Sequence, residues 1–366
     1  MPSITVTTSP LTDSSAKKRP PELVLISGGD PAGIAPEVVR KAIVGFDSTT
    51  TSFLYLYNAG HADADDEEFQ RLKQALKSRL HLISGGSDDL VETARGLSET
   101  ADGSVYLYPV LRPHEKPCLP GRASTHSGDL SFRALDLACS VIDAMSDDIS
   151  SVALVTAPLS KEFVIRSGQS DFSGHTGYLA RRFNRNVLML MHGRGFSVIP
   201  LTEHVALADV PSQLRAVLGR SDLPALLVDL ARRAVFSGKE IALCGLNPHC
   251  GEGGLIGNEE QEILMPFIEK VREAGVSIKG PLPADTLFME SVRKQFRLIL
   301  SCYHDQGLIP FKALEGEQGI NVTIGLPFLR TSPDHGTAYG LAGKEIADST
   351  SMRRALEAAM SSELSH

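Results

Sequence analysis

Residues that could carry chemistry crowd into one stretch near the C-terminal end of the chain, residues 302–339. In this stretch, charged side chains and an amide alternate with glycines, prolines and apolar runs such as VTIGLPFL. A core would bury such charges only at high cost, and a plain surface loop would not interleave them with apolar runs. The pattern indicates a pocket for a small anion, with Arg330 able to hold a carboxylate or phosphate by two parallel hydrogen bonds. It also fits surface charges on turns. The residues concerned are His304, Asp305, Lys312, Asn321, Arg330, Asp334 and His335.

Three histidines share one sequence context. His204, His249 and His304 each follow an apolar run (SVIPLTEH, IALCGLNPH, LILSCYH) and each precede a loop. The carboxyl ends of strands in an α/β sheet converge on one edge, where sites form. Three neutral imidazoles with an open fourth position make a catalytic divalent-metal site. The wide spacing fits unrelated loop histidines as well, because it lacks the local signature of an HExxH motif.

Two further segments place polar groups at turns. Lys161 stands where the strand SVALVT turns into a helix, a position where active groups collect in open α/β sheets, although a solvated lysine fits equally. His175 and Thr176 lie between two glycines in SGHTG, where the backbone leaves room for a ligand. A turn histidine without a ligand is the alternative for His175.

The elements that must position these groups alternate along the chain. Apolar runs predict strands and 3.6-residue periodicity predicts helices, so the chain is predicted to be α/β. In GGDPAGI, Asp30 is a plausible N-cap with Pro31 at the first helical position, although the segment is not a GxGxxG fingerprint. The predicted strands are 23–27, 53–60, 80–84, 104–111, 151–156, 187–192, 196–204, 241–244 and 298–301, and the predicted helices are 35–43, 67–79, 129–145, one from 160 and one from 258.

Composition narrows the classes of function. The 366 residues are enough for one large or two ordinary domains. A net charge of -8 without a basic stripe argues against nucleic-acid binding, and no apolar run is long enough to cross a bilayer. Five cysteines without a CxxC pair fit a reducing, cytoplasmic location. Residues 1–21, rich in Ser, Thr and Pro, are predicted to be a disordered tail without the features of a targeting peptide.

Nine segments together resemble one known family, that of 4-hydroxythreonine-4-phosphate dehydrogenase. They occur in the family's order over nearly the whole chain, which makes the resemblance far more specific than any single segment. The segments are GDPAGIAPE, APLSKE, SGHT, LTEH, CGLNPHCGEGG, GPLPADTLF, YHDQGL, GINVTIGLPFLRTSPDHGTA and LAGK.

The resemblance implies a fold like that of isocitrate and isopropylmalate dehydrogenases, with two α/β/α domains and a central cleft. Residues 22–155 and 305–366 would form the first, cofactor-side domain, and residues 156–304 the second, which carries the metal and the dimer contact.

The resemblance also implies a homodimer with a shared active site, and a small phosphorylated substrate. The implied reaction is an NAD-dependent, metal-assisted oxidation of 4-hydroxythreonine 4-phosphate, with NADP as the alternative cofactor. Loss of carbon dioxide then gives 3-amino-2-oxopropyl phosphate for pyridoxal phosphate biosynthesis.

Family roles transfer to matching positions of this sequence. The metal ligands fall on His204, His249 and His304, for zinc, cobalt, magnesium or manganese. Asp285, Asp305 and Lys161 are candidates for catalysis, the two aspartates as a general base or as partners of a metal histidine. The substrate contacts fall on His175, Thr176, Lys312, Asn321 and Arg330, and the cofactor candidates are Asp334, His335, Gly336 and Thr337.

Some positions depart from the family pattern. Gly177 stands where many members have an acidic residue, Ala35 where GIGPE is usual, and Cys250 where an alanine is usual. These departures leave the substrate open to related dehydrogenases, which act on 4-phosphorylated threonate or erythronate or on a carboxylated cis-dihydrodiol. The alternative outside the enzymes is a sensor protein that binds a phosphorylated metabolite without catalysing a reaction.

Overall fold

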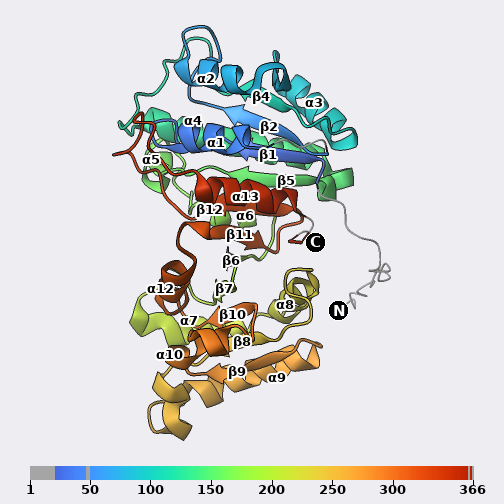
Figure 1. Ribbon diagram of the computed structural model, residues 1–366. Helices are drawn as coiled ribbons and strands as arrows, with labels where there is room; N and C mark the ends of the chain where they lie inside the picture. The colour runs from blue at the N-terminus through green and yellow to red at the C-terminus, as the bar shows by residue number, and fades with distance from the viewer. Residues whose placement is uncertain (1–20, 47–49, 362, 365–366) are drawn as a thin grey trace, which may run out of the picture.

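The structure is a computed structural model that describes residues 21–46, 50–361 and 363–364. Residues 1–20 of the predicted tail lie outside the described part. In this part, twelve strands form one sheet in the order β3-β4-β2-β1-β5-β12-β11-β6-β7-β10-β8-β9 (Figure 1). The strands are β1 (Leu23–Ser27), β2 (Ser52–Tyr57), β3 (Leu80–Leu82), β4 (Val105–Pro109), β5 (Val152–Thr156), β6 (Leu188–His192), β7 (Ser197–Pro200), β8 (Ile241–Cys244), β9 (Ile278–Leu282), β10 (Leu298–Ser301), β11 (Ile320–Ile324) and β12 (Leu329–Pro333).

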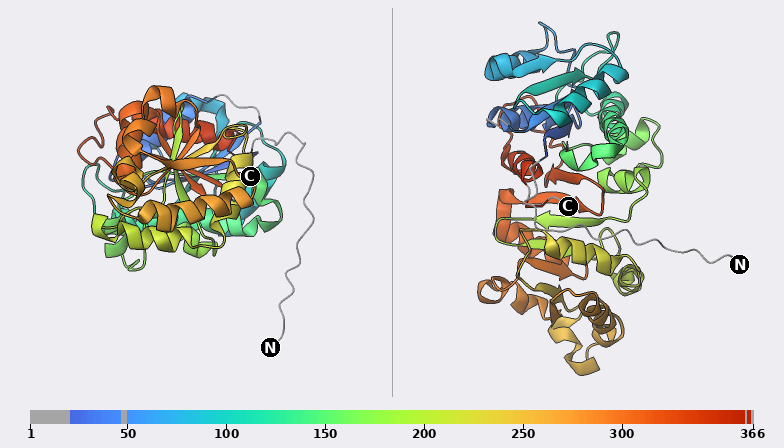
Figure 2. Two further views of the ribbon diagram at one scale, coloured as in Figure 1. Left: turned by 90° about the horizontal axis from the view of Figure 1, so that it is seen from below. Right: turned by 90° about the vertical axis from the view of Figure 1, so that its right-hand side faces the viewer.

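The sheet has two parallel arms and an antiparallel centre. The strands from β3 to β12 in the sheet order pair in parallel, and so do β7, β10, β8 and β9. Between the arms, β11 is antiparallel to both β12 and β6, and β6 is antiparallel to β7. Viewed from below, each strand is rotated relative to its neighbour about a common axis, which is the twist expected of a sheet (Figure 2).

Helices cover both faces of the sheet, because buried parallel strands are apolar on both sides. In β1, Val24 and Ile26 belong to one core, whereas Leu23 and Leu25 belong to the other. The helices are α1 (Ala35–Val44), α2 (Glu67–Leu76), α3 (Ser87–Glu99), α4 (Thr125–Ala144), α5 (Lys161–Arg166), α6 (His175–Arg182), α7 (Val210–Leu218), α8 (Leu223–Arg232), α9 (Met265–Glu273), α10 (Ala284–Leu287), α11 (Glu290–Arg293), α12 (His304–Glu315) and α13 (Thr350–Met360). The mixed α/β class predicted from the sequence is confirmed.

The predicted domain division stays a prediction. The strands from 22–155 and 305–366 occupy one side of the β6–β11 pair, and those from 156–304 occupy the other. A single sheet crosses this boundary, with the C-terminal helix α13 packed beside α1 in the first arm (Figure 1).

The predicted cap of the first helix was wrong. Helix α1 begins at Ala35 after Ile34, with Pro36 in its first turn. Asp30 is instead fully buried and accepts hydrogen bonds from the Ala32 backbone N–H (2.9 Å) and the Tyr339 hydroxyl (2.7 Å). The carboxylate therefore ties the glycine-containing loop to a segment some 300 positions later in the chain, which local capping rules do not anticipate.

Two predicted boundaries also moved. Strand β7 ends at Pro200 rather than at His204, so this histidine lies on the loop beyond the strand. The helix expected from residue 258 starts with a single π-helical turn, Glu260–Leu264, which runs into α9.

Candidate functional site

A cavity of about 520 Å³ lies where β11, β12 and α6 meet the loop after β7. It collects residues from segments that are far apart in the sequence, including most of the predicted substrate contacts. Its lining consists of Ser173, Gly174, His175, Thr176, Gly177, Met189, Glu203, His204, Asn321, Arg330, Ser332, Pro333, Asp334 and His335.

Arg330 is the cation at the floor of this cavity. It is 2% exposed, and burial lowers the pKa of its guanidinium to about 9. Two of its nitrogens donate to the hydroxyls of Thr323 (3.0 Å) and Thr156 (2.5 Å), on the neighbouring strand β11 and at the end of β5. Its Nε has no partner, and no carboxylate of the described residues pairs with it. A buried arginine without a counter-charge is suited to receive an anion.

His175 and Asn321 present further unpartnered atoms. His175 begins α6 after Gly174, whose φ of +100° is readily accessible only to glycine. Its Nε2 and the Oδ1 of Asn321 are buried without hydrogen-bond partners among the described residues. Burial, followed by the charge of Arg330, holds the pKa of His175 well below its usual range, so the imidazole is neutral at pH 7.

Lys312 and Asp334 form an ion pair at the rim of the cavity. The Lys312 Nζ on α12 lies 3.2 Å from the Asp334 Oδ2 at the end of β12. Lys312 was predicted to contact the substrate and Asp334 to contact the cofactor. In the structure the two side chains instead pair with each other.

The segment after Asp334 borders a smaller cavity of about 100 Å³, which His335 and Gly336 share with Thr156 and Pro158. The His335 Nε2 is buried without a partner in the described chain. Next to it, the Thr337 carbonyl accepts a hydrogen bond from the Ile34 N–H (2.9 Å), and a Cβ on Gly33 would lie 2.6 Å from that carbonyl oxygen. The unpartnered ring nitrogen and the close approach of the two loops fit a cofactor that binds beside them.

Two of the three predicted metal histidines are neighbours. The rings of His204 and His304 lie 5.5 Å apart, centroid to centroid. The Nδ1 of His304 lies 2.7 Å from the Asp305 Oδ1, so the Nε2 is the ring nitrogen available to a ligand among the described residues. An imidazole held by a carboxylate through its other nitrogen is the usual arrangement of a metal-ligating histidine. The donors present therefore fit a divalent ion.

His249 lies on an unusual turn between β8 and the start of α9. His249, Cys250 and Glu252 all have φ between 45° and 55°, so the backbone makes a left-handed turn. Each such non-glycine residue costs about 1 kcal/mol. The buried carboxylate of Glu260 holds the turn, because it accepts hydrogen bonds from both the backbone N–H (2.7 Å) and the side-chain amide (3.0 Å) of Asn247. Strain held in this way is typical of functional loops.

The single chain does not gather all three histidines. Within the described residues, one trio of possible ligand groups has its donor atoms within 4.8 Å of one another: Glu115, His126 and Asp129. In that trio, Arg133 pairs with Glu115 (2.9 Å) and with Asp129 (2.9 Å), and the His126 Nε2 bonds the Lys116 carbonyl (2.9 Å). The arginine already supplies the positive charge, so this trio is a poor metal site.

The catalytic candidates lie in different surroundings. Asp305 is bound to His304, and its side chain is 69% exposed. Asp285, on α10, is exposed and close enough to Cys250 that its charge helps to raise the pKa of that thiol, after the larger effect of burial. Lys161 is exposed at the first position of α5, just beyond the lining of the smaller cavity. All three roles stay predictions.

Glu203 is a cavity residue that sequence reasoning missed. It stands directly before His204 and lines the main cavity. Burial raises the pKa of its carboxyl, against the opposing effect of His204 and His304. The string LTEH contains it, but only the position of the loop shows that this carboxylate faces the cavity.

The buried histidines predict how stability depends on pH. Burial lowers the pKa of His192 to about 4 and that of His175 as well, whereas the unfolded chain titrates near its ordinary value of about 6.5. Below about pH 6.5 the unfolded state therefore takes up protons that the folded state refuses, and stability falls. From pH 6.5 to pH 5 we expect His192 to cost about 1 to 2 kcal/mol of unfolding free energy, and His175 to act in the same direction.

The His192→Asn variant should lack the contribution of His192, which urea titrations of both proteins at pH 6.5 and pH 5 measure. His114→Asn, at an exposed position, is the matched control, and an unchanged pH dependence in His192→Asn would contradict the prediction.

No helix within the described residues is both long enough and apolar enough to span a membrane.

Comparison with known proteins identifies the family. The family described as "Pyridoxal phosphate biosynthetic protein PdxA" matches residues 64–359. The chain is 35% identical over 340 residues to a 4-hydroxythreonine-4-phosphate dehydrogenase of Roseobacter denitrificans, covering 92% of this chain and 95% of the relative. It is also 35% identical over 358 residues to a D-threonate 4-phosphate dehydrogenase of Bordetella bronchiseptica, covering 95% of this chain and 94% of the relative.

A solved structure supports the same family. The crystal structure of 4-hydroxythreonine-4-phosphate dehydrogenase from Klebsiella pneumoniae superimposes with a TM-score of 0.72 at 29% identity, over 95% of this chain and all of that one. The chain therefore belongs to the PdxA family of dehydrogenases and is an oxidoreductase.

Proposed function

We propose that the chain oxidises 4-hydroxythreonine 4-phosphate with NAD and a divalent metal ion, and that the product then loses carbon dioxide to give 3-amino-2-oxopropyl phosphate. One observation supports this above all. Buried polar atoms that have no partner among the described residues converge on one cavity and the smaller cavity beside it, and one of them belongs to an arginine that no described carboxylate pairs with. These atoms are the His175 Nε2, Asn321 Oδ1, Arg330 Nε and His335 Nε2.

The chain's own residues would bind both ends of such a substrate. Arg330 would hold one anionic group, and Lys312 at the rim would reach the other once it separates from Asp334. The backbone N–H groups at the start of α6 and the neutral His175 would donate to phosphate oxygens, as helix N-termini do. Asn321 and Thr176 would orient the substrate through hydrogen bonds.

When bound, the metal ion supplies a Lewis acid and NAD supplies the hydride acceptor. Asp305 would hold His304 in the orientation and tautomer that a metal ligand needs. Oxidation of the hydroxyl on carbon 3 places a ketone β to the carboxylate. Decarboxylation of such a β-keto acid is easy, so the site needs no separate machinery for that step.

D-threonate 4-phosphate is the second candidate substrate, and one feature of the chain favours it. This compound carries a hydroxyl where 4-hydroxythreonine 4-phosphate carries an ammonium group. Gly177 lines the cavity at a position where many family members offer a carboxylate that could pair with an ammonium. The relative from Bordetella bronchiseptica carries the D-threonate name at the same level of identity.

We also propose that two copies of the chain share the site. The loop with His249 is not gathered with His204 and His304 in one chain. Large apolar side chains are exposed close in sequence to the predicted metal and catalytic residues, as at an interface that a second copy covers. They are Leu207 (71% exposed), Leu255 (84%), Met289 (57%) and Ile309 (65%).

The test is NADH absorbance at 340 nm with NAD and each candidate substrate in turn. We expect a signal with 4-hydroxythreonine 4-phosphate that a chelator abolishes and added zinc, cobalt or manganese restores. A signal with only D-threonate 4-phosphate, or with phosphorylated erythronate or a carboxylated cis-dihydrodiol, would replace the substrate and keep the reaction class. Substrate binding without any NADH formation would refute the proposed oxidation reaction and support the role of a sensor.

A further inference from the structure

The three segments that carry the predicted metal histidines follow adjacent strands. In the sheet, β7, β10 and β8 pair in parallel and in that order, so their carboxyl ends lie side by side. The segments after these strands carry His204, His304 and His249 in turn. His249 is exposed on its left-handed turn, so its position depends on the contacts that hold the rest of that loop.

Buried hydrogen bonds join these three segments to one another. The Thr202 Oγ1 donates to the Cys302 carbonyl (2.8 Å), which links the segment after β7 to the segment after β10. The Cys302 Sγ donates to the Cys244 carbonyl (3.3 Å) at the end of β8. Each of the three residues is at most 3% exposed. The strand ends beneath the histidines therefore form one connected unit.

Gln306 adds to this unit with both polar atoms of its amide. It lies on the first turn of α12, two residues after His304. Its Oε1 accepts a hydrogen bond from the Cys302 N–H (2.7 Å), and its Nε2 donates to the Gly245 carbonyl (2.7 Å). These partners fix the orientation of the amide, because an N–H needs an acceptor and a carbonyl needs a donor. One side chain thus joins the helix of His304 to the loop of His249.

Gly245 transmits the contact with Gln306 to the turn that carries His249. It is the first residue after β8 and is buried. A Cβ added to Gly245 would lie 2.7 Å from the Cys250 Sγ, so the turn folds back onto the beginning of its own loop. A displacement of the Gly245 carbonyl would therefore move the residue that directly follows His249.

Helix α12 gives Gln306 a rigid support. A Cβ on Gly307 would lie 2.4 Å from the Ser301 Oγ and 2.5 Å from the Val198 Cγ1, so the first turn of the helix packs directly against β10 and β7. At the other end of α12, the Glu315 carboxylate accepts hydrogen bonds from backbone N–H groups in the turn between β6 and β7. A side chain on a helix held at both ends can set the position of a loop closely.

We propose that Gln306 is a positioning residue of the metal site, which holds the loop of His249 in place relative to His304. This inference depends on the metal-dependent function proposed above. Gln306 acts through the two histidines, because its amide is already bonded to Cys302 and Gly245. Both ends of this connection lie in one chain. A change at Gln306 therefore displaces His249 whether that histidine completes the site of its own subunit or the site of a second one.

The test measures the affinity of the full-length, metal-free protein for Co²⁺ and Zn²⁺ by competition with a chelator, together with the visible absorption spectrum of the Co²⁺ form. Gln306→Met keeps the length of the side chain and removes both hydrogen bonds. We expect metal binding to weaken about 10- to 100-fold, as is typical when a residue that orients metal ligands is lost. The spectrum should also change, because it depends on the geometry of the ligands.

Gln306→Glu separates positioning from charge. It keeps the shape of the side chain and the acceptor for the Cys302 N–H, but it places a carboxylate oxygen against the Gly245 carbonyl. An added negative charge would by itself tighten the binding of a cation. Weaker metal binding by this variant as well would therefore come from the displaced loop, and we expect that result.

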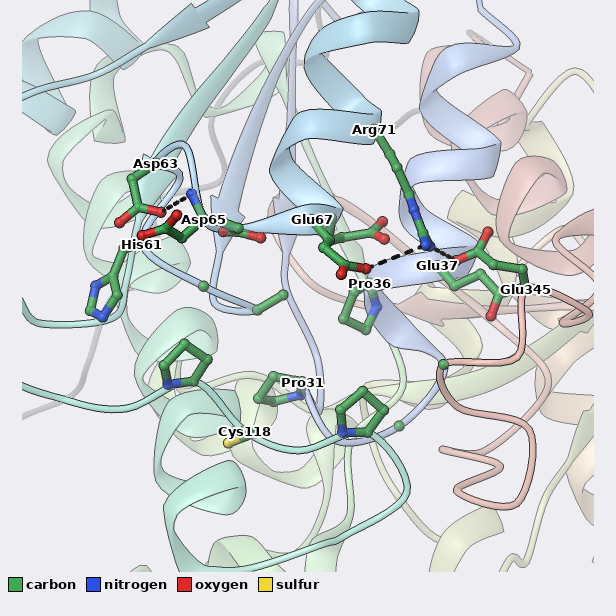
Figure 3. A pocket seen from close by; sticks show the side chains of 18 residues that line it. Pro31, Pro36, Glu37, His61, Asp63, Asp65, Glu67, Arg71, Cys118 and Glu345 are labelled. Carbon is green, nitrogen blue, oxygen red and sulfur yellow. Dashed lines mark hydrogen bonds and ion pairs between the residues drawn. The ribbon is translucent and has the colours of Figure 1, made fainter.

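Gln70→Met is the matched control. The Gln70 Nε2 also donates to a backbone carbonyl, that of Asp63 (2.6 Å). Asp63 lines a separate cavity of about 510 Å³ against α1 and α2, in the first arm of the sheet (Figure 3). This variant should keep the metal affinity and the Co²⁺ spectrum of the wild type. Thermal unfolding of each metal-free protein shows whether it is folded at the temperature of the titration.

The outcomes distinguish the inference from the function on which it depends. Wild-type metal affinity and an unchanged Co²⁺ spectrum in both Gln306 variants would overturn the inference. A lower unfolding temperature with unchanged metal binding would show that Gln306 only stabilises the fold, which also overturns it. If the wild type itself binds neither ion, the proposed metal-dependent function fails and the inference fails with it.

Discussion

The Arg330→Met variant is expected to lose activity about 100- to 1000-fold and yet unfold at a higher temperature than the wild type in phosphate-free buffer. The guanidinium is 2% exposed, and burial lowers its pKa to about 9 without any carboxylate pairing with it in the described residues. A buried charge in this state costs several kcal/mol, which methionine of similar volume avoids. Thermal unfolding with and without inorganic phosphate measures the effect, since phosphate should stabilise the wild type and not the variant.

Arg233→Met is the matched control. Arg233 is also buried, at 3% exposure, but it pairs with Asp229 (2.9 Å) and donates to the Leu364 carbonyl (2.6 Å). Its loss should lower the unfolding temperature and leave substrate binding intact. If Arg330→Met were instead less stable than the wild type without phosphate, the folded chain would already satisfy Arg330, and the anion-site assignment would lose its main support.

Mixing two inactive variants is expected to restore activity. His249→Ala and His304→Ala should each lose metal and nearly all turnover, because each removes one imidazole from a three-ligand site. If His249 completes the site of the second subunit, a mixed dimer contains one intact site. Equal mixing should then recover about one quarter of wild-type activity, since half of the dimers are mixed and each has one of two sites.

The measurement is NADH formation after the two variants are unfolded and refolded together, with each variant refolded alone as the control. The metal content of each sample reports on the same site independently of turnover. Recovery in the mixture alone supports a shared site. No recovery from variants that fold and form mixed dimers would place all three ligands in one chain and contradict the shared site.

Local sequence patterns were sufficient to predict most of the strands. The run LVLIS predicted β1 because four apolar residues followed by a serine suit a short strand that is buried on both faces. Gly174 and the strands β11 and β12 placed His175, Asn321 and Arg330 at one cavity, as the spacing of polar groups between apolar runs had indicated. The association of these residues was therefore predictable from sequence, whereas their catalytic roles remain to be tested.

Long-range partners were not predictable from local rules. Asp30 looks like an N-cap in its own segment, and only the fold shows that Tyr339 donates to it. The sequence singles out Arg330 by its neighbours, but it does not show that Arg330 has no carboxylate partner in the described chain whereas Arg233 pairs with Asp229. The ion pairs of Glu345 with Arg40 and Arg71 were missed for the same reason, because the three residues meet only through the fold.

The position of β12 in the sheet affects how the chain folds while it is being synthesised. Strand β5 ends at Thr156 and pairs with β1 on one side, but its other neighbour, β12, begins only at Leu329. At the usual pace of translation, the edge of β5 stays unpaired for on the order of ten to thirty seconds while the second arm emerges from the ribosome. Exposed strand edges recruit other chains. The nascent protein thus passes through a vulnerable interval set by its topology, during which the binding of a chaperone would protect it.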